Sequence, residues 1–559
     1  MTRFDRSAAL DRLADVHFDV VVVGGGITGA GVALDAASRG LRTALVERDD
    51  FASGTSSKSS KLVHGGLRYL QNGDVRLVYE ALAERQRLRH NAPHLVRILP
   101  FLIPIFSKDG VISKKLARAM GSAMWMYDLT GGARIGKLHK RLSVDEALAH
   151  MPTLPRNRLA GSYLYYDARA DDARLTLTLA RTAAIDFGAT VVNDAPVTGI
   201  MKDHLGRACG VTIAADGNEI EVRADAVVNA TGVWADDVRA LDEGTHPDTI
   251  RPAKGIHIAV PWRLVRNDIA VVIPVPKDKR SVFVVPWGDY TYIGTTDTDY
   301  DGAIDEPQCT AADIDYLLRA INFSVDGTIT QADIVGTWAG LRPLVRDAGS
   351  ERTADLSRRH KVGASPSGMV TITGGKLTTY REMAADTVDA VVELLGQKRG
   401  ERPARHSRTK RLRLRGADGF DEFVADPPPS SLDAASLTHL ADRYGGEART
   451  LVAMVEHDPD LGRPLVPGLP YLRAEALYAA RYEMARSIDD IFSRRTRARL
   501  LGRDASAAAA AEVAELVGDE LGWNDAERHR QADLYRDAVE RERHAADLPE
   551  VAADALLGA

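Results

Sequence analysis

The chain has 559 residues, which at about 100–200 residues per domain allows two to four domains and excludes a mini-protein. Hydrophobic residues make up 45% of the chain and charged residues 27%, as in folded globular proteins and unlike disordered ones. The chain has 72 Lys and Arg residues and 78 Asp and Glu residues, and the net charge of −6 provides no overall positive potential that would attract nucleic acid. The only cysteines, Cys209 and Cys309, are a hundred residues apart, which excludes a disulfide framework and a zinc site.

The N-terminal region predicts a nucleotide-binding βαβ unit. Residues 19–23 are a β-branched run typical of a strand buried in a parallel sheet, residues 30–39 have helical spacing, and residues 41–46 form a second strand. Between strand and helix, Gly24, Gly26 and Gly29 satisfy G-x-G-x-x-G, and Glu47 follows the second strand. This context favours a dinucleotide over an accidental glycine turn, with the pyrophosphate at the helix N-terminus and a ribose hydroxyl on Glu47. It does not separate FAD from NAD.

Residues 53–70 are rich in serine, threonine and glycine with interleaved leucines. A surface linker has such a composition, but the segment begins just after the nucleotide-binding strand, where a loop can lie along a pyrophosphate and a flavin. We favour the cofactor-lining interpretation.

Residues 112–127 predict an amphipathic helix, with lysines and an arginine beside an apolar face that includes Met120 and Met124. Such a helix can lie in a membrane interface or pack in the core of a cap domain, and both alternatives remain open. No apolar run approaches the length of about 18 residues that a spanning helix needs, and residues 1–16 do not form a signal-peptide core. We therefore expect neither a membrane span nor export.

The second half of the chain predicts a change of domain. Residues 50–380 mix short strands with helices and show no repeat, as in interleaved sheet and cap domains. Residues 398–415 carry nine basic residues against one acid, and three prolines follow at 427–429. We predict an oxidoreductase region over 17–397, a basic and proline-rich linker over 398–430 and an α-helical C-terminal domain over 431–546, with helices at 474–487, 505–521 and 525–546.

Several motifs of the chain resemble those of a known enzyme family. GGGITGAG at 24–31, TSSKSSKLVHGGLRYL at 55–70, NATG at 229–232, VVPWGDYTYIGTTDTD at 284–299, GLRPL at 340–344 and GGKLTTY at 374–380 occur in the order found in FAD-dependent glycerol-3-phosphate dehydrogenases. YAARYEMA at 478–485 and the arginine-rich residues 489–496 resemble the helical C-terminal domain of that family. The match is more specific than the glycine fingerprint shared by D-amino-acid-oxidase-like flavoproteins.

The resemblance implies an α/β fold: a Rossmann-like FAD-binding domain interleaved with an antiparallel-sheet substrate and cap domain, followed by the helical domain. It implies oxidation of sn-glycerol 3-phosphate to dihydroxyacetone phosphate with non-covalent FAD as hydride acceptor, no metal, and a membrane quinone as the electron acceptor. The enzyme would then contact the cytoplasmic face of the cell membrane peripherally. Whether the chain forms a homodimer stays open.

Site residues are carried over from the matched motifs. Phosphate and the reacting hydroxyl need cations and hydrogen-bonding groups, for which arginine is suited by its planar fork. The catalytic candidates are His257, Arg342 and Lys376, and the substrate-binding candidates are Arg68, Tyr69 and Arg358. The cofactor-binding candidates are Val23, Gly24, Gly25, Gly26, Ile27, Thr28, Gly29, Glu47, Arg48, Thr55, Ser56, Ser57, Ser60, Lys61, Leu62, His64, Gly65, Gly66, Thr231, Gly232, Gly375, Lys376, Leu377 and Thr378.

The base is the least determined of these roles. Hydride loss at C2 requires a group that takes the hydroxyl proton, and we assign it to His257, with His64 as the alternative. A histidine that merely packs on a strand is the plain alternative for His257. Two rival functions stay open: a glycerol-3-phosphate oxidase that reduces oxygen to peroxide, and a FAD-binding redox sensor without turnover.

Overall fold

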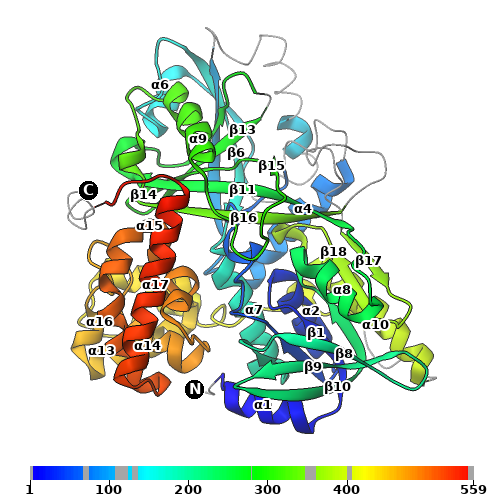
Figure 1. The fold of residues 1–559 in the computed structure, drawn as a ribbon. Coiled ribbons are helices and arrows are strands. Elements are labelled where there is room, and N and C mark those ends of the chain that lie inside the picture. The colour runs from blue at the N-terminus through cyan, green and yellow to red at the C-terminus, as the bar shows by residue number, and fades with distance from the viewer. Residues whose placement is uncertain are drawn as a thin grey trace.

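The computed structural model describes residues 4–66, 75–106, 124–128, 136–278, 280–345, 360–399 and 406–551. Figure 1 shows three parts: a first sheet with its helices at the lower right, a second sheet above it, and the C-terminal helices at the lower left. The predicted fold class is confirmed.

The first sheet is the predicted nucleotide-binding sheet. Its order is β17 (Lys361–Ala364), β18 (Val370–Thr373), β10 (Asn218–Asn229), β1 (Phe18–Val23), β2 (Thr43–Val46) and β7 (Thr190–Val192), and β8 (Val197–Lys202) and β9 (Ala208–Ala215) extend from β10. β1 runs parallel to both β2 and β10 and is buried along its whole length, as its β-branched sequence predicts.

Helices cover both faces of this sheet. On one face α2 (Ile27–Ser38) packs against α7 (Asp172–Phe187) and α10 (Tyr380–Arg399). On the other, α1 (Arg6–Asp15) buries its leucines against Val21 and Val23 of β1. The βαβ unit is therefore confirmed, with α2 beginning three residues before the predicted helix.

The second sheet forms the wall opposite the nucleotide-binding turn. Its order is β15 (Thr298–Asp299), β11 (Ile250–Pro261), β14 (Tyr290–Gly294), β13 (Ser281–Trp287), β12 (Ala270–Pro274), β4 (Arg97–Phe106), β6 (Leu159–Arg169) and β3 (Leu62–Val63), with β16 (Gly336–Val345) on β11 and β5 (Lys140–Leu142) on β6. Its pairs are antiparallel except β12 with β4. Because the chain leaves the first sheet after β10 and returns to it at β17, the two sheets are interleaved, as predicted.

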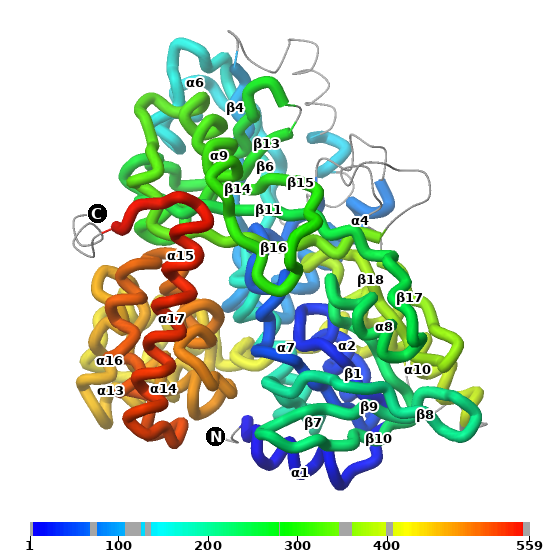
Figure 2. Tube along the Cα trace, viewed as in Figure 1, coloured from blue at the N-terminus to red at the C-terminus, as the bar shows by residue number. Residues whose placement is uncertain are grey.

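The remaining helices flank these sheets or form the C-terminal domain. The former are α4 (Val75–Asn91), α6 (Val144–His150), α8 (Ala235–Glu243) and α9 (Ala311–Ser324). The latter are α11 (Phe420–Ala425), α12 (Ala434–Tyr444), α13 (Ala448–His457), α14 (Arg473–Tyr482), the π-helical η11 (Asp490–Thr496), α15 (Ala498–Leu501), α16 (Arg503–Leu521) and α17 (Asp525–Ala545). Figure 2 shows α17 lying along α16, and α16 also packs against α14.

The helix predicted over 474–487 ends early, at Tyr482. Met484 adopts a left-handed backbone conformation with φ 54°, so the chain turns there. The turn brings the buried carboxylate of Glu483 onto the Arg174 guanidinium of α7, at 2.7 and 2.8 Å. An ion pair between domains thus interrupts the helical pattern.

The predicted linker, 398–430, is packed where the structure describes it. Ser407 donates a hydrogen bond to Asp35 of α2 at 2.5 Å, and Leu414 lies in the core formed with α2 and α10. Phe420 and Phe423 lie in the core of the C-terminal domain. Two of its arginines pair with acids, Arg413 with Asp418 and Arg415 with Glu447, so part of a sequence that resembles a solvated linker forms ordered structure.

Of the predicted helix over 112–127, residues 112–123, including Met120, lie outside the described residues. Residues 124–128 are helical: Met124 and Tyr127 are buried against Leu82, while Trp125 and Met126 are exposed. Across the described ranges, we find no helix with the length and apolar character to cross a membrane.

Candidate active site

The glycine turn between β1 and α2 leaves no room for side chains. Gly24 has φ 105°, and a Cβ on it would lie 2.8 Å from the carbonyl oxygen of Ala230 in the neighbouring strand. A Cβ on Gly29 would lie 1.8 Å from the carbonyl oxygen of Gly24. The amide of Ile27 donates to Ser56 Oγ at 2.8 Å. Strand, turn and helix thus meet as a phosphate-binding turn requires.

Glu47 lies at the end of β2 beside this turn. Its carboxylate accepts hydrogen bonds from the amides of Gly25, at 2.5 Å, and Asp49, at 2.9 Å. Burial raises the pKa of Glu47 to about 7, even though the two amide bonds favour the ionised form. The group is therefore poised to become fully ionised when further donors, such as ribose hydroxyls, reach it.

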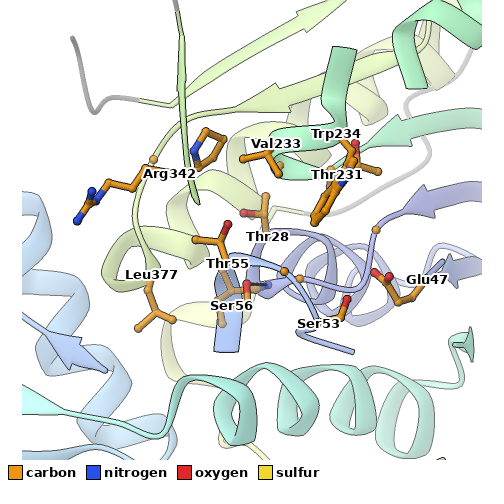
Figure 3. Close-up of a pocket in the computed structure, with 18 of the residues that line it drawn as sticks. Thr28, Glu47, Ser53, Thr55, Ser56, Thr231, Val233, Trp234, Arg342 and Leu377 are labelled. Carbon is orange, nitrogen blue, oxygen red and sulfur yellow. Dashed lines mark hydrogen bonds between the residues drawn. The ribbon is translucent and has the colours of Figure 1, made fainter. Parts of the chain in front are cut away.

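A cavity of about 490 Å³ runs from the glycine turn to the second sheet. Arg342 and Glu47 lie at opposite ends of it in Figure 3, with Thr28, Thr55 and Ser56 between them. Most of the predicted cofactor residues line this cavity, namely Val23, Gly24, Gly26, Ile27, Thr28, Glu47, Arg48, Thr55, Ser56, Ser60, Leu62, His64, Thr231, Gly232, Gly375, Lys376, Leu377 and Thr378. Gly25, Gly29, Ser57, Lys61, Gly65 and Gly66 do not line it.

We call residues 53–61 the cavity loop, since most of its members line the cavity. Thr55 Oγ1 donates to the carbonyl of Leu341 at 2.5 Å, and the carbonyls of Ser59 and Ser60 accept from Trp338 Nε1 at 3.2 Å and Tyr292 Oη at 2.8 Å. The loop is thus attached to the second sheet and is not the surface linker that its composition also allows.

Arg342 of β16 supplies a cation at one end of the cavity. Asp297 accepts from its guanidinium at 3.0 Å, and the Thr296 carbonyl accepts from it at 3.1 Å. Gly255 makes room for it, because a Cβ there would lie 2.6 Å from the Arg342 guanidinium. The arginine is therefore held in one orientation at the wall of the cavity. Lys376 lines the cavity before η7 (Leu377–Thr379), which precedes α10.

His257 does not line the cavity but lies directly behind it. Its side chain is only 2% exposed, stacks on Trp338 at 4.7 Å between ring centroids, and has Nε2 2.8 Å from Ser60 Oγ. Burial, with the charges of Lys61 and Arg342, holds its pKa well below the usual value, so the imidazole is neutral. His64, the alternative, lines the cavity directly.

Arg68, Tyr69 and Arg358, the substrate-binding candidates, lie outside the described residues. The sequence reasoning missed a group of apolar and small residues that line the cavity: Val46, Ala195, Val197, Val233, Trp234, Val238, Leu241, Pro343, Leu344 and Met383. Pro343 and Leu344 lie within the GLRPL motif and Trp234 lies two residues after NATG, so all three could have been added. Ala195, between β7 and β8, and Val197, the first residue of β8, carry no recognisable signal.

Two family models match the chain. Residues 19–381 match the FAD dependent oxidoreductase family, and residues 407–528 match the C-terminal domain of alpha-glycerophosphate oxidase.

Named relatives match nearly the whole chain. Glycerol-3-phosphate dehydrogenase 2 of Mycobacterium tuberculosis is 42% identical over 546 residues, which cover 96% of this chain and 90% of that protein. The human mitochondrial glycerol-3-phosphate dehydrogenase is 37% identical over 93% of this chain and 73% of its own length.

Solved structures share the fold. The glycerol-3-phosphate dehydrogenase of Bacillus halodurans, solved in complex with FAD, superposes with a TM-score of 0.76 at 31% identity, covering 98% of this chain and 99% of that one. The L-alpha-glycerophosphate oxidase of Mycoplasma pneumoniae, at 17% identity and a TM-score of 0.54, covers 67% of this chain and 95% of its own, and shares the fold alone.

Proposed function

The chain belongs to the FAD-dependent glycerol-3-phosphate dehydrogenase family, and on that basis we propose that it oxidises sn-glycerol 3-phosphate to dihydroxyacetone phosphate. The observation that carries the proposal is the cavity that joins the glycine turn to Arg342 and Lys376. FAD, when bound, supplies the acceptor for the hydride that leaves C2.

The residues fit a dinucleotide at the turn and an anionic substrate beyond it. The side-chain-free glycine backbone, the α2 N-terminus and Glu47 suit the pyrophosphate and the adenosine ribose. Arg342, held by Asp297, suits a phosphate or hydroxyl oxygen, and Lys376 adds a second positive charge.

We assign the proton acceptor to His257 acting through Ser60. Ser60 lines the cavity, and its Oγ lies 2.8 Å from His257 Nε2, so a proton taken from the C2 hydroxyl by Ser60 Oγ can pass to the imidazole. Its low pKa keeps the imidazole neutral and able to accept.

The function is tested by anaerobic addition of glycerol 3-phosphate to the purified yellow protein. We expect the absorbance of the oxidised flavin to be lost within the first seconds after mixing, because reduction removes the oxidised chromophore. Glycerol, which lacks the phosphate, is the matched control. A spectrum that glycerol 3-phosphate leaves unchanged would exclude the proposal and favour a sensor without turnover.

We further propose that a membrane quinone, and not oxygen, reoxidises the enzyme. The resemblance to quinone-linked dehydrogenases supports this, while the oxidase remains the second candidate because an oxidase shares the fold. Stopped-flow reoxidation by air-saturated buffer and by a soluble quinone separates the two. Faster reoxidation by air would favour the oxidase.

A quinone dissolved in lipid requires contact with the membrane, and we propose peripheral docking at its cytoplasmic face. Trp125 and Met126, exposed by 56% and 43%, are the described part of the helix predicted for this contact. Replacing both with Glu should weaken co-sedimentation with anionic liposomes while a soluble-dye assay stays unchanged. Met124→Glu is unsuitable, because Met124 is buried in the core. Undiminished sedimentation would exclude this helix as the contact.

A further inference from the structure

An acidic residue of the FAD domain holds the cavity loop from behind. Asp172, in the first turn of α7, has no exposed surface. Its carboxylate accepts hydrogen bonds from the Ser59 amide at 3.0 Å, from Ser59 Oγ at 2.6 Å and from Lys61 Nζ at 3.1 Å. Ser59 lines the cavity, so Asp172 fixes the backbone of a cavity wall without reaching the cavity itself.

An arginine of the C-terminal domain completes this arrangement. Arg497, between η11 and α15, is also fully buried and donates to Asp172, to Asp171 at 2.7 and 3.0 Å, and to the carbonyl of Ser57 at 3.4 Å. It therefore contacts the cavity loop both directly and through Asp172. The ion pair of Arg174 with Glu483 also joins the two domains, but neither of its side chains bonds a residue of the cavity loop.

The charges in this cluster balance only when Arg497 is present. Three carboxylates, Asp171, Asp172 and Glu475, face three cations, Lys61, Arg497 and Arg443, and Arg443 bridges Asp171 and Glu475 at 3.1 Å each. Without Arg497, Lys61 is the sole cation on Asp172, and a buried carboxylate that loses a partner must protonate or move.

The backbone also depends on these contacts. Lys61 has φ 56° and Arg497 has φ 143°, both in the region that non-glycine residues rarely adopt. Such conformations persist where surrounding interactions fix them. Lys61 is fixed by Asp172 and by the Ser57 carbonyl, which accepts from its Nζ at 2.9 Å.

We propose that Arg497 is a positioning residue for FAD: through Asp172 and Ser57 it sets the path of the cavity loop, and this gives the C-terminal helical domain a role in cofactor binding. The inference rests on the proposed function only in taking the cavity as the FAD site. Arg497 touches neither the cavity nor the reacting atoms, so its effect must pass through the loop.

The test compares holoenzyme variants that disturb the cluster with one that disturbs only the C-terminal domain. Arg497→Met and Asp172→Asn remove the two halves of the contact, and Arg497→Lys retains the charge without the fork. Arg503→Met is the matched control, because Arg503 lies six residues after Arg497, is equally buried, and its side chain bonds Asp504 and the Pro549 carbonyl, both near the C-terminus of the chain. FAD release is followed by its fluorescence after dilution, together with the visible flavin spectrum and the melting temperature.

We expect Arg497→Met to release FAD at least tenfold faster than wild type and to shift the flavin spectrum, with Arg497→Lys in between. Asp172→Asn should produce the same changes, and the double variant should be little worse than either single one, because both act on one contact. Arg503→Met should lower the melting temperature while its FAD release stays within twofold of wild type.

The proposal is overturned if Arg497→Met and Arg503→Met speed release equally at equal loss of melting temperature. If Arg497→Met does not fold, Asp172→Asn decides, and unchanged release and spectrum in that variant would also overturn it. Wild-type protein that holds FAD but is not bleached by glycerol 3-phosphate would refute the proposed function alone, since the release comparison does not depend on turnover.

Discussion

Arg342→Ala is expected to impair the proposed reaction through two separate effects. The first is loss of a charge-assisted contact to the substrate, worth about 1.5–3 kcal/mol. The second arises from Asp297, whose side chain is 8% exposed and which would lose its guanidinium partner. Its negative charge, no longer offset by that guanidinium, would repel an anion about 4 Å away by about 1 kcal/mol even in water. Together these effects predict a fall in kcat/KM of roughly 60- to 700-fold at about 1.4 kcal/mol per tenfold.

The assay is steady-state oxidation of glycerol 3-phosphate with a soluble dye as acceptor, on preparations matched for FAD content. Arg251→Met is the control, because Arg251 of β11 pairs with Asp299 at 2.6 Å, has a side-chain exposure of 28% against 25% for Arg342, and does not line the cavity. It should stay within twofold of wild type. Adding Asp297→Asn to Arg342→Ala should restore about fivefold by removing the repulsion. If Arg342→Ala behaves like Arg251→Met, Arg342 has no role in the site.

Three further outcomes are expected. Acid precipitation should leave FAD in the supernatant, because the glycine turn binds the pyrophosphate without a covalent bond; flavin in the pellet would contradict this. Burial raises the pKa of Glu47 to about 7, and ribose hydroxyls would favour its ionised form. The Kd for FAD, measured by fluorescence titration, should therefore rise by up to about tenfold per pH unit below pH 7 and stay level above pH 7. The Glu47→Gln variant should lose this dependence on pH. His257→Gln should slow anaerobic flavin reduction about 100-fold or more with a smaller effect on substrate Kd, and equal losses would make His257 a binding residue.

Local signals predicted the nucleotide half of the site well. Gly24, Gly29 and Glu47 act within one βαβ unit, where strand, turn and helix follow one another in the chain, so their spacing is sufficient to place them. The cavity end that holds Arg342 depends instead on β16 pairing with β11, which brings Gly255 opposite Gly340. Spacing along the chain contains no trace of that pairing, and only the family resemblance identified Arg342.

The packing of residues 398–430 and the position of His257 could not be predicted from the sequence. A basic stretch has the same composition whether its arginines face water or acids such as Glu447, and only the fold supplies the acids. His257 was expected to face the substrate, yet the structure places Ser60 between it and the cavity. Which of two neighbouring polar groups reaches a cavity is set by tertiary packing.

The contact of Gly24 with Ala230 bears on how the protein is made. These residues are about 200 positions apart, and the turn is closed only when β10 lies beside β1. During synthesis, β1 can pair with β2 soon after both leave the ribosome, but its other edge stays open until residue 229 has emerged. Open edges of apolar strands invite aggregation, and pairings between distant segments form slowly. Nascent chains that stop short of β10 should therefore be unable to retain the cofactor and should depend on chaperones.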